Sequence, residues 1–220
     1  MIQIEIELQL LKTEVTNMWD LVRSQLIKAK TSLLNFDKDL AREVVLKERR
    51  VNGAELKIDR DCENIFALLT PVAVDLRFVL AVLKINSNLE RTGDIAEGIA
   101  KHIIRTNEPF KQGLLDSTGL VEMYDEGIRM LEDTLTAFET EDSILARSVF
   151  KKDEVLDNIN EGANSAIVEY LKLHPEDVDQ ALYIHSIIRK LERVGDQAKN
   201  IAEEIIFYLE AKVLKHRHTH

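Results

Sequence analysis

The 220-residue chain contains a single cysteine, Cys62, and can therefore form no internal disulfide and no thiolate metal cluster. It has only three prolines and eight glycines, which leave little room for long loops. Uncharged runs such as Asn64–Val74 are about half as long as the roughly 20 residues that span a bilayer. These absences exclude a disulfide-bonded scaffold and predict no membrane insertion.

The chain also has too few basic side chains to balance its acidic ones. There are 39 Asp and Glu against 29 Lys and Arg, so the formal net charge is −10. Such a surface repels nucleic acid and attracts metal cations or basic protein patches, so we expect no nucleic-acid partner. The first residues, Met1–Glu7, become acidic early and lack the basic segment of a signal peptide, which predicts a cytoplasmic location.

What the chain does have is the composition of long amphipathic helices. It is 45% hydrophobic and 31% charged, and Leu, Ile, Ala, Glu and Lys are abundant. Apolar residues recur with the helical period between the few turn signals. The pattern predicts six helices, at residues 3–34, 37–69, 73–107, 114–139, 141–173 and 177–214. Long helices joined by short turns pack as antiparallel neighbours.

A repeated hexapeptide divides the chain into two similar halves. Leu89–Asp94 returns 102 residues later as Leu191–Asp196, and 10 of 18 positions match between residues 89–106 and 191–208. Self-similarity over this span indicates one structural unit written twice. We therefore predict an all-α fold of two tandem antiparallel three-helix bundles related by an internal repeat, with domains at residues 1–110 and 111–220.

Each copy of the hexapeptide carries two carboxylates four residues apart. Glu90 and Asp94 form the first pair, and Glu192 and Asp196 form the second. A helix places such residues on one face, one turn apart, where like charges repel. Because the repulsion is present twice, a cation is expected beside each pair.

The preceding helix of each unit supplies a second polar pair. At an offset of 105 residues, Glu48 corresponds to Asp153 and Asn52 corresponds to Asp157. These residues stand at the same distance from the turn as the carboxylates of the next helix, so an antiparallel hairpin brings them to one level. We expect an open patch on the seam between the two helices. The predicted metal ligands are Glu48, Asn52, Glu90 and Asp94 in the first unit and Asp153, Asp157, Glu192 and Asp196 in the second.

Two other interpretations of these residues remain open. Clustered oxygen ligands suit Mg, Ca, Mn or carboxylate-bridged iron. The carboxylates could instead form ordinary salt bridges in a metal-free helical interaction module, since Lys199 and Arg193 lie three residues from Asp196. A carboxylate-bridged metal oxidase or ferroxidase is the enzymatic alternative, but no histidine follows a glutamate by three positions, as such di-iron sites require.

No catalytic or cofactor-binding motif is present, so we expect a protein that is not an enzyme. His185 lies two turns before Glu192 and could be an accessory ligand, but Leu83 at the matching position of the first unit favours an ordinary helix histidine. The histidine-rich tail at residues 216–220 is terminal, and no function is assigned to it.

The doubled Leu-Glu-Arg-x-Gly-Asp motif, about 100 residues apart in an acidic helical chain, resembles the PhoU family of phosphate-uptake regulators. The segment Pro71–Arg77 is similar to the family's first-unit turn. The resemblance implies two three-helix bundles with multinuclear iron or zinc clusters on the eight ligand positions. Asn52 departs from the family's acidic pattern, so we expect the first cluster to be weaker or smaller.

The resemblance also implies a function and partners. Members of the family are adaptors without established catalysis. They restrain the phosphate ABC transporter through its ATPase subunit and keep the associated sensor histidine kinase silent when phosphate is plentiful. Many are homodimers. The expected role is therefore negative regulation of phosphate uptake and of phosphate-responsive signalling.

Overall fold

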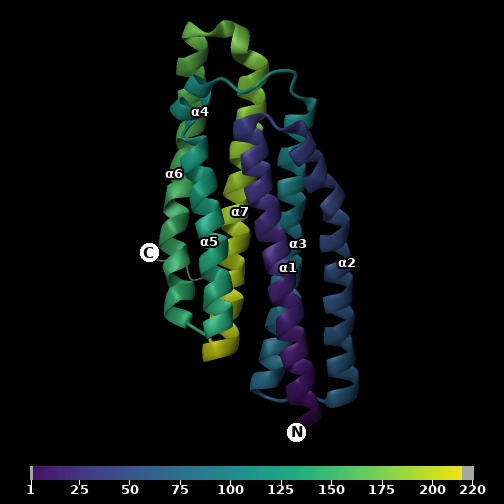
Figure 1. The fold of residues 1–220 in the computed structure, drawn as a ribbon. Coiled ribbons are helices and arrows are strands. Elements are labelled where there is room, and N and C mark those ends of the chain that lie inside the picture. The colour runs from purple at the N-terminus through teal and green to yellow at the C-terminus, as the bar shows by residue number, and fades with distance from the viewer. Residues whose placement is uncertain (1, 215–220) are drawn as a thin grey trace.

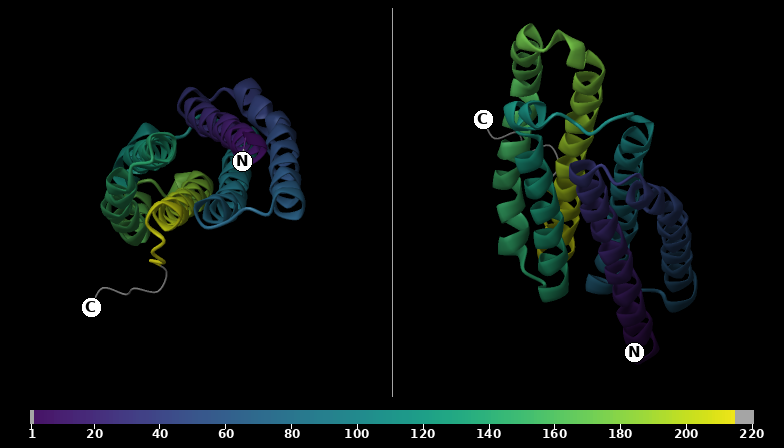
Figure 2. Two further views of the ribbon diagram at one scale, coloured as in Figure 1. Left: turned by 90° about the horizontal axis from the view of Figure 1, so that it is seen from below. Right: turned by 45° about the horizontal axis from the view of Figure 1, so that its top comes forward.

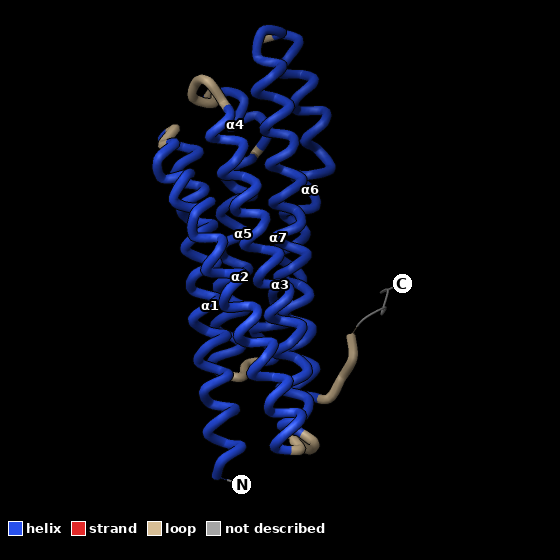
Figure 3. Tube along the Cα trace, turned by 90° about the vertical axis from the view of Figure 1, so that its right-hand side faces the viewer, coloured by secondary structure: helices blue, strands red, loops and turns tan. Residues whose placement is uncertain are grey.

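The structure is a computed structural model that describes residues 2–214, and all of its regular elements are helices (Figures 1 and 3). Every predicted helix is present, with most ends within three residues of the predicted ones. The elements are α1 (Ile2–Asn35), α2 (Lys38–Leu69), α3 (Val74–Arg105), α4 (Gln112–Thr118), α5 (Leu120–Thr140), α6 (Ser143–Leu173), the 3₁₀ turn η1 (Pro175–Asp177) and α7 (Val178–Glu210).

The helices form two bundles that lie side by side (Figures 1 and 2). Helices α1, α2 and α3 pack together as the first bundle, and α5, α6 and α7 pack together as the second, with α4 against α6. Helices α3 and α7 lie in the centre and run antiparallel along the seam between the bundles. The all-α fold with a doubled three-helix unit is therefore confirmed. Polar contacts along α3 and α7 follow the antiparallel direction, since Lys84 contacts Glu204, Asn88 contacts Asn200 and His102 contacts Ser186.

The second helix of each unit starts at an equivalent aspartate. Asp37 caps α2 by accepting hydrogen bonds from the backbone N–H groups of the second and third residues after it, and Asp142 caps α6 in the same way. A side-chain acceptor at this place satisfies amide groups that have no partner within the helix. The two caps are 105 residues apart, the offset at which Glu48 corresponds to Asp153, so the repeat extends to the helix starts.

Two helix boundaries differ from the prediction. The segment predicted as one helix at 114–139 is divided into α4 and α5, because Gly119 adopts a φ of +66° that an α-helix cannot continue through. The last helix ends at Glu210 and not at residue 214, since Ala211 turns to a left-handed φ of 55°. Hydrophobic periodicity does not report either turn, because the apolar pattern continues across both.

An aromatic cluster joins the two bundles near one end of the seam. The ring of Phe138 in α5 lies 5.5 Å from that of Trp19 in α1 and 6.0 Å from that of Phe78 in α3, centroid to centroid. Tyr208 of α7 packs edge-on against both phenylalanines. Trp19, Phe138 and Tyr208 are buried, so this part of the core belongs to both repeats.

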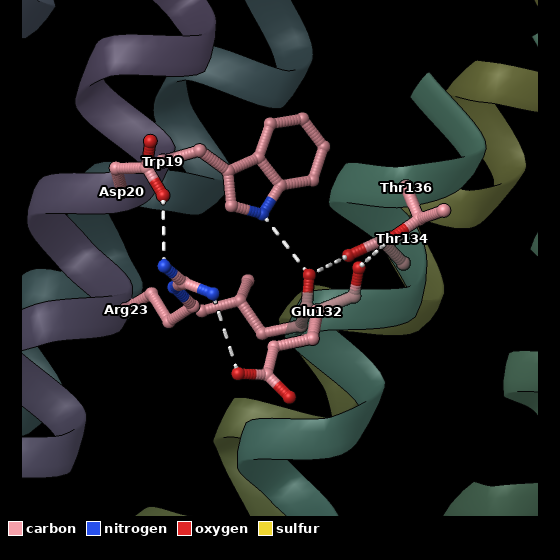
Figure 4. A network of polar contacts seen from close by, with 7 residues as sticks. Trp19, Asp20, Arg23, Glu132, Thr134 and Thr136 are labelled. Atoms are coloured by element: carbon pink, nitrogen blue, oxygen red, sulfur yellow. Dashed lines mark hydrogen bonds and ion pairs between the residues drawn. The ribbon is translucent and has the colours of Figure 1, made fainter. Parts of the chain in front are cut away.

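Polar contacts between α1 and α5 reinforce this junction (Figure 4). The indole N–H of Trp19 donates to the backbone carbonyl of Leu131 at 3.2 Å, in a buried position. Beside it, Arg23 of α1 forms ion pairs with Asp20 and with Glu132 of α5. The division into domains at residues 1–110 and 111–220 stays a prediction, because the two bundles share this core.

Residues 2–214 contain no helix that combines the length and the apolar character needed to cross a bilayer.

Candidate functional site

The first set of predicted ligands lies where α2 meets α3. Glu48 projects from α2 toward Gly93 of the repeated motif, and a β-carbon at residue 93 would lie 3.1 Å from both carboxylate oxygens. The missing side chain at Gly93 therefore lets the two helices approach at the level of Glu48. As a result the Glu48 side chain is only 4% exposed.

Glu48 is a buried carboxylate with one satisfied oxygen. Gln25 of α1 donates a hydrogen bond to its Oε2 at 3.1 Å, whereas its Oε1 has no hydrogen-bond partner within residues 2–214. Burial raises the pKa of Glu48 to about 7, against the effect of the Gln25 hydrogen bond, and the charges of Asp94, Glu97 and Glu90 add to the rise. Gln25 was not predicted as part of the site, because nothing in the repeat indicates that α1 contacts it.

The other ligands of the first set form the outer part of the seam. Glu90 is half-buried, and Asn52 and Asp94 are exposed. Burial, together with the charges of Asp94 and Glu55, raises the pKa of Glu90. Glu55 was not predicted, although it follows Glu48 by seven residues, a spacing that places both on one helical face. Acidic side chains therefore surround Glu48 on its open side.

The second set has the same plan at the junction of α6 and α7. Asp153 faces Gly195 and is 5% exposed. Lys199 of α7 forms ion pairs with Asp153 and with Asp196, the latter at 3.0 Å. Burial opposes the charged form of Lys199, but its hydrogen bonds to the two carboxylates outweigh that effect and raise its pKa. The contact of Lys199 with Asp196 was expected from their spacing, but its contact with Asp153 across the helix pair was not.

The remaining residues of the second set again lie further out. Asp157 is exposed, and Glu192 and Asp196 are half-buried. Burial raises the pKa of Glu192, and the charges of Asp196 and Asp157 add to the rise. Burial likewise raises the pKa of Asp153, against the effect of the Lys199 ammonium. The charges of Asp157 and Asp196 act on both Asp153 and Glu192, so the four carboxylates of the second set are near enough to influence one another; that they bind metal stays a prediction.

The expectation of an open patch is wrong for one residue in each set. Glu48 and Asp153 are buried, although the other ligands are partly or fully exposed. The two glycines of the motif are the physical reason. Because they have no side chain, the two helices approach closely at this level, and the carboxylate opposite each glycine is buried. Each set therefore has a buried inner carboxylate and an accessible outer rim.

The donor groups of the first set fit a hard metal cation. Carboxylate and amide oxygens are the ligands that such cations prefer, and the unpartnered Oε1 of Glu48 is a buried acceptor that a cation would satisfy. The outer carboxylates would have to turn inward to complete the coordination. Glu90 and Asp94 can do so because neither forms an ion pair with any Lys or Arg of residues 2–214.

A different group is tighter. His174, Glu176 and Asp177, at the turn before α7, are the one group of three such side chains in the described part of the chain whose ligand atoms all lie within 4.8 Å of one another. Asp177 also accepts a hydrogen bond from the Tyr170 hydroxyl at 2.8 Å. The eight predicted ligands therefore form looser sets than this turn, and their metal binding stays a prediction.

The two histidine sites from the sequence add little to this geometry. His185 lies half-buried in α7, and its role as an accessory ligand stays a prediction. The histidine-rich tail, residues 216–220, falls outside the described residues.

The structure thus defines the class of the protein as an all-α chain with a duplicated three-helix unit, in which each copy carries an acidic helix pair. The model of the PhoU domain matches the chain twice, at residues 15–103 and 120–205, and the chain belongs to the PhoU family. The confirmed resemblance covers both bundles and places each hexapeptide inside a matched domain. Family membership assigns the chain to accessory proteins and not to enzymes, which argues against the oxidase alternative.

Characterised relatives and solved structures agree with this assignment. The chain is 35% identical to the phosphate-specific transport system accessory protein PhoU of Edwardsiella tarda, over 97% of this chain and 87% of that protein. It is 33% identical to the protein of the same name from Escherichia coli strain K12, over 97% of this chain and 88% of that protein. The crystal structure of PhoU from Pseudomonas aeruginosa superposes with a TM-score of 0.88 at 30% identity, covering 94% of this chain and 99% of the other.

Proposed function

We propose that this chain is a negative regulator of phosphate uptake and phosphate-responsive signalling that acts in the cytoplasm. Its proposed partners are the ATPase subunit of the phosphate ABC transporter and a phosphate sensor histidine kinase. The observation that carries the proposal is the match of both bundles to the family of phosphate transport accessory proteins over nearly the whole chain. Regulation by contact with a partner suits a helical protein whose candidate metal ligands lie mostly at the surface, where two helices meet.

The proposal includes a metal-dependent element in that seam. A metal cluster, of iron or zinc by family resemblance or of Mg, Mn or Ca by the chemistry of the donors, would neutralise the acidic side chains. Glu48 and Asn52 of α2 would bind it together with Glu90 and Asp94 of α3, which would hold the two helices against each other. The corresponding ligands in α6 and α7 are Asp153, Asp157, Glu192 and Asp196.

The regulatory role is tested in a bacterial strain that lacks its own accessory protein and carries a reporter for phosphate-starvation genes. Expression of this chain is expected to restore repression at high phosphate. Gly162→Ala, on the exposed face of α6, serves as a control variant that should repress normally. A folded, expressed chain that leaves the reporter fully active would overturn the regulatory role.

The partner assignment needs a direct measurement. Biolayer interferometry against the purified ATPase subunit and against the cytoplasmic part of the kinase is expected to show saturable binding to each. Absence of binding to both proteins by a chain that restores repression would rule out these partners and leave the regulatory role in place.

Metal binding is tested by elemental analysis of the purified protein without its histidine-rich tail. Asp94→Ala combined with Asp196→Ala removes one accessible carboxylate from each set and is expected to reduce bound metal strongly. An unchanged metal content in the double variant would show that the ligand assignment is wrong.

Self-association is the last element of the proposal. We infer a homodimer from family resemblance, and light scattering coupled to size exclusion tests it directly. A mass of 25.2 kDa across the accessible concentration range would identify a monomer.

A further inference from the structure

The two acidic sets differ in the residue that follows the motif aspartate by three positions. In the first unit Asp94 is followed by Glu97, and in the second unit Asp196 is followed by Lys199. One turn further along, the charges are again opposite, since the first unit has Lys101 where the second has a glutamate. The same helical position therefore carries a negative charge beside one set and a positive charge beside the other.

In the second unit the lysine is built into the acidic set. The ammonium of Lys199 contacts both the buried carboxylate of Asp153 and that of Asp196, and the Lys199 side chain is only 28% exposed. It therefore occupies the place between α6 and α7 where a bound cation would bridge the same two carboxylates. A divalent ion could enter only by breaking both ion pairs and lying close to a positive charge, which is unfavourable in a partly buried site.

In the first unit the corresponding position offers no such cation. Glu97 is held by Lys101 on its own helix, in an ion pair directed along α3. Three cations, Arg91 of α3 and Lys190 and Arg193 of α7, line a surface depression beside Asp94, yet none of them forms an ion pair with a carboxylate of the described chain. Within residues 2–214, the 4%-exposed Glu48 thus keeps an oxygen without a hydrogen-bond partner, and neither Glu90 nor Asp94 beside it forms an ion pair with a Lys or Arg.

We propose that Lys199 is an internal counter-ion that closes the second acidic set, so that the chain binds divalent metal in the first set alone. This inference rests on the metal binding proposed above and reverses the expectation that Asn52 makes the first site the weaker one. The second unit then holds α6 against α7 without metal, whereas the stability of the α2–α3 pair depends on metal. Metal binding then applies to the first copy of the motif, and salt bridging applies to the second.

Equilibrium dialysis against Mn²⁺, with free ion counted by electron paramagnetic resonance, tests the proposal on the full-length protein after removal of bound metal. Glu48→Gln is expected to abolish tight binding, and Asp153→Asn is expected to leave it unchanged. Lys199→Gln should create a second class of sites that Asp153→Asn then removes. Glu97→Lys, which transfers the lysine to the first unit, should weaken binding by about tenfold or more.

Lys172→Gln is the matched control, because it removes a lysine of α6 that pairs with Glu169 and with no carboxylate of either set. It should keep one class of sites. Circular dichroism confirms that each variant is folded, and Asp153→Asn in the otherwise native chain gives a result even where a lysine variant fails to fold. Loss of Mn²⁺ on Asp153→Asn alone, or no additional sites in folded Lys199→Gln, overturns the asymmetry while metal binding stands. No Mn²⁺ bound by the native chain or by Lys199→Gln overturns metal binding itself.

Discussion

A β-carbon on Gly195 would lie 2.7 Å from Oδ1 of Asp153, so these two residues can face each other only because residue 195 has no side chain. The same relation holds between Gly93 and Glu48 in the first unit, at 3.1 Å. Glycine within a helix costs about 1 kcal/mol relative to alanine. In each unit this glycine allows the two helices to approach closely enough to bury one carboxylate.

Gly195→Ala is expected to destabilise the protein by about 1–2 kcal/mol. The new methyl group displaces Asp153 and Leu156, and the cost of that displacement exceeds the gain from the higher helix propensity of alanine. Gly162→Ala is the matched control, since a β-carbon there would have no atom of residues 2–214 within 4 Å beyond its own helical turn, and it should stabilise by roughly 0.5–1 kcal/mol. Urea unfolding followed by circular dichroism measures both changes. Equal stabilisation by the two variants would show that α6 and α7 do not approach closely at this level.

Glu48→Gln is expected to stabilise the metal-free protein by about 1–2 kcal/mol at pH 8. The substitution removes a buried charge with an unpartnered oxygen and keeps an acceptor for Gln25. Thermal unfolding in the presence of a chelator gives the comparison with the native chain. Asp157→Asn, an exposed position in the other unit, should change the melting temperature little. A clear loss of stability on Glu48→Gln would mean that the Glu48 charge is satisfied in the metal-free protein.

His102 should make the protein less stable as the pH falls through about 6.5. Burial, with the positive charges of Lys190 and Arg105, lowers the pKa of His102 in the folded state. Between the unfolded and folded pKa values the unfolded chain binds a proton that the folded chain does not, so stability is lost on acidification. The Ser186 hydroxyl contacts Nε2 at 3.1 Å and the Tyr183 ring packs against the imidazole, whereas Nδ1 has no partner in residues 2–214.

His102→Gln is accordingly expected to reduce the drop in melting temperature between pH 7.5 and pH 5.5 by roughly 1–3 °C relative to the native chain. Differential scanning fluorimetry in matched buffers measures the difference. His185→Gln, which changes a half-buried histidine of α7, is the control. An identical pH dependence in the His102 variant and the native chain would contradict the lowered pKa.

The two bundles should unfold together and not one after the other. Trp19, the one tryptophan of the chain, packs against Phe138 and bonds to Leu131 across the junction, so its fluorescence reports on the contact between the units. The fluorescence and circular dichroism transitions are expected to coincide within roughly 2 °C. A fluorescence change that precedes the loss of helix would instead support two independent domains at residues 1–110 and 111–220.

Several features of the fold could be predicted from the sequence because they depend on local spacing. The apolar period predicts the helices, and the repeated Leu-Glu-Arg-x-Gly-Asp predicts that the two halves share one structure. Equal distances from the turn predict which polar residues of α2 and α3 lie at the same level, since an antiparallel hairpin fixes that register. The break at Gly119 could not be predicted in this way, because the apolar pattern runs through it while the backbone turns to a positive φ.

The sequence by itself determined the helices, the duplication and the positions of the paired carboxylates, because spacing along a helix decides which residues share a face. Only the tertiary structure decided which carboxylates are buried and what neutralises them, because those properties depend on residues of other helices. Gln25 reaches Glu48 from α1, and Lys199 reaches Asp153 from α7. These contacts make two sites of similar sequence chemically unequal.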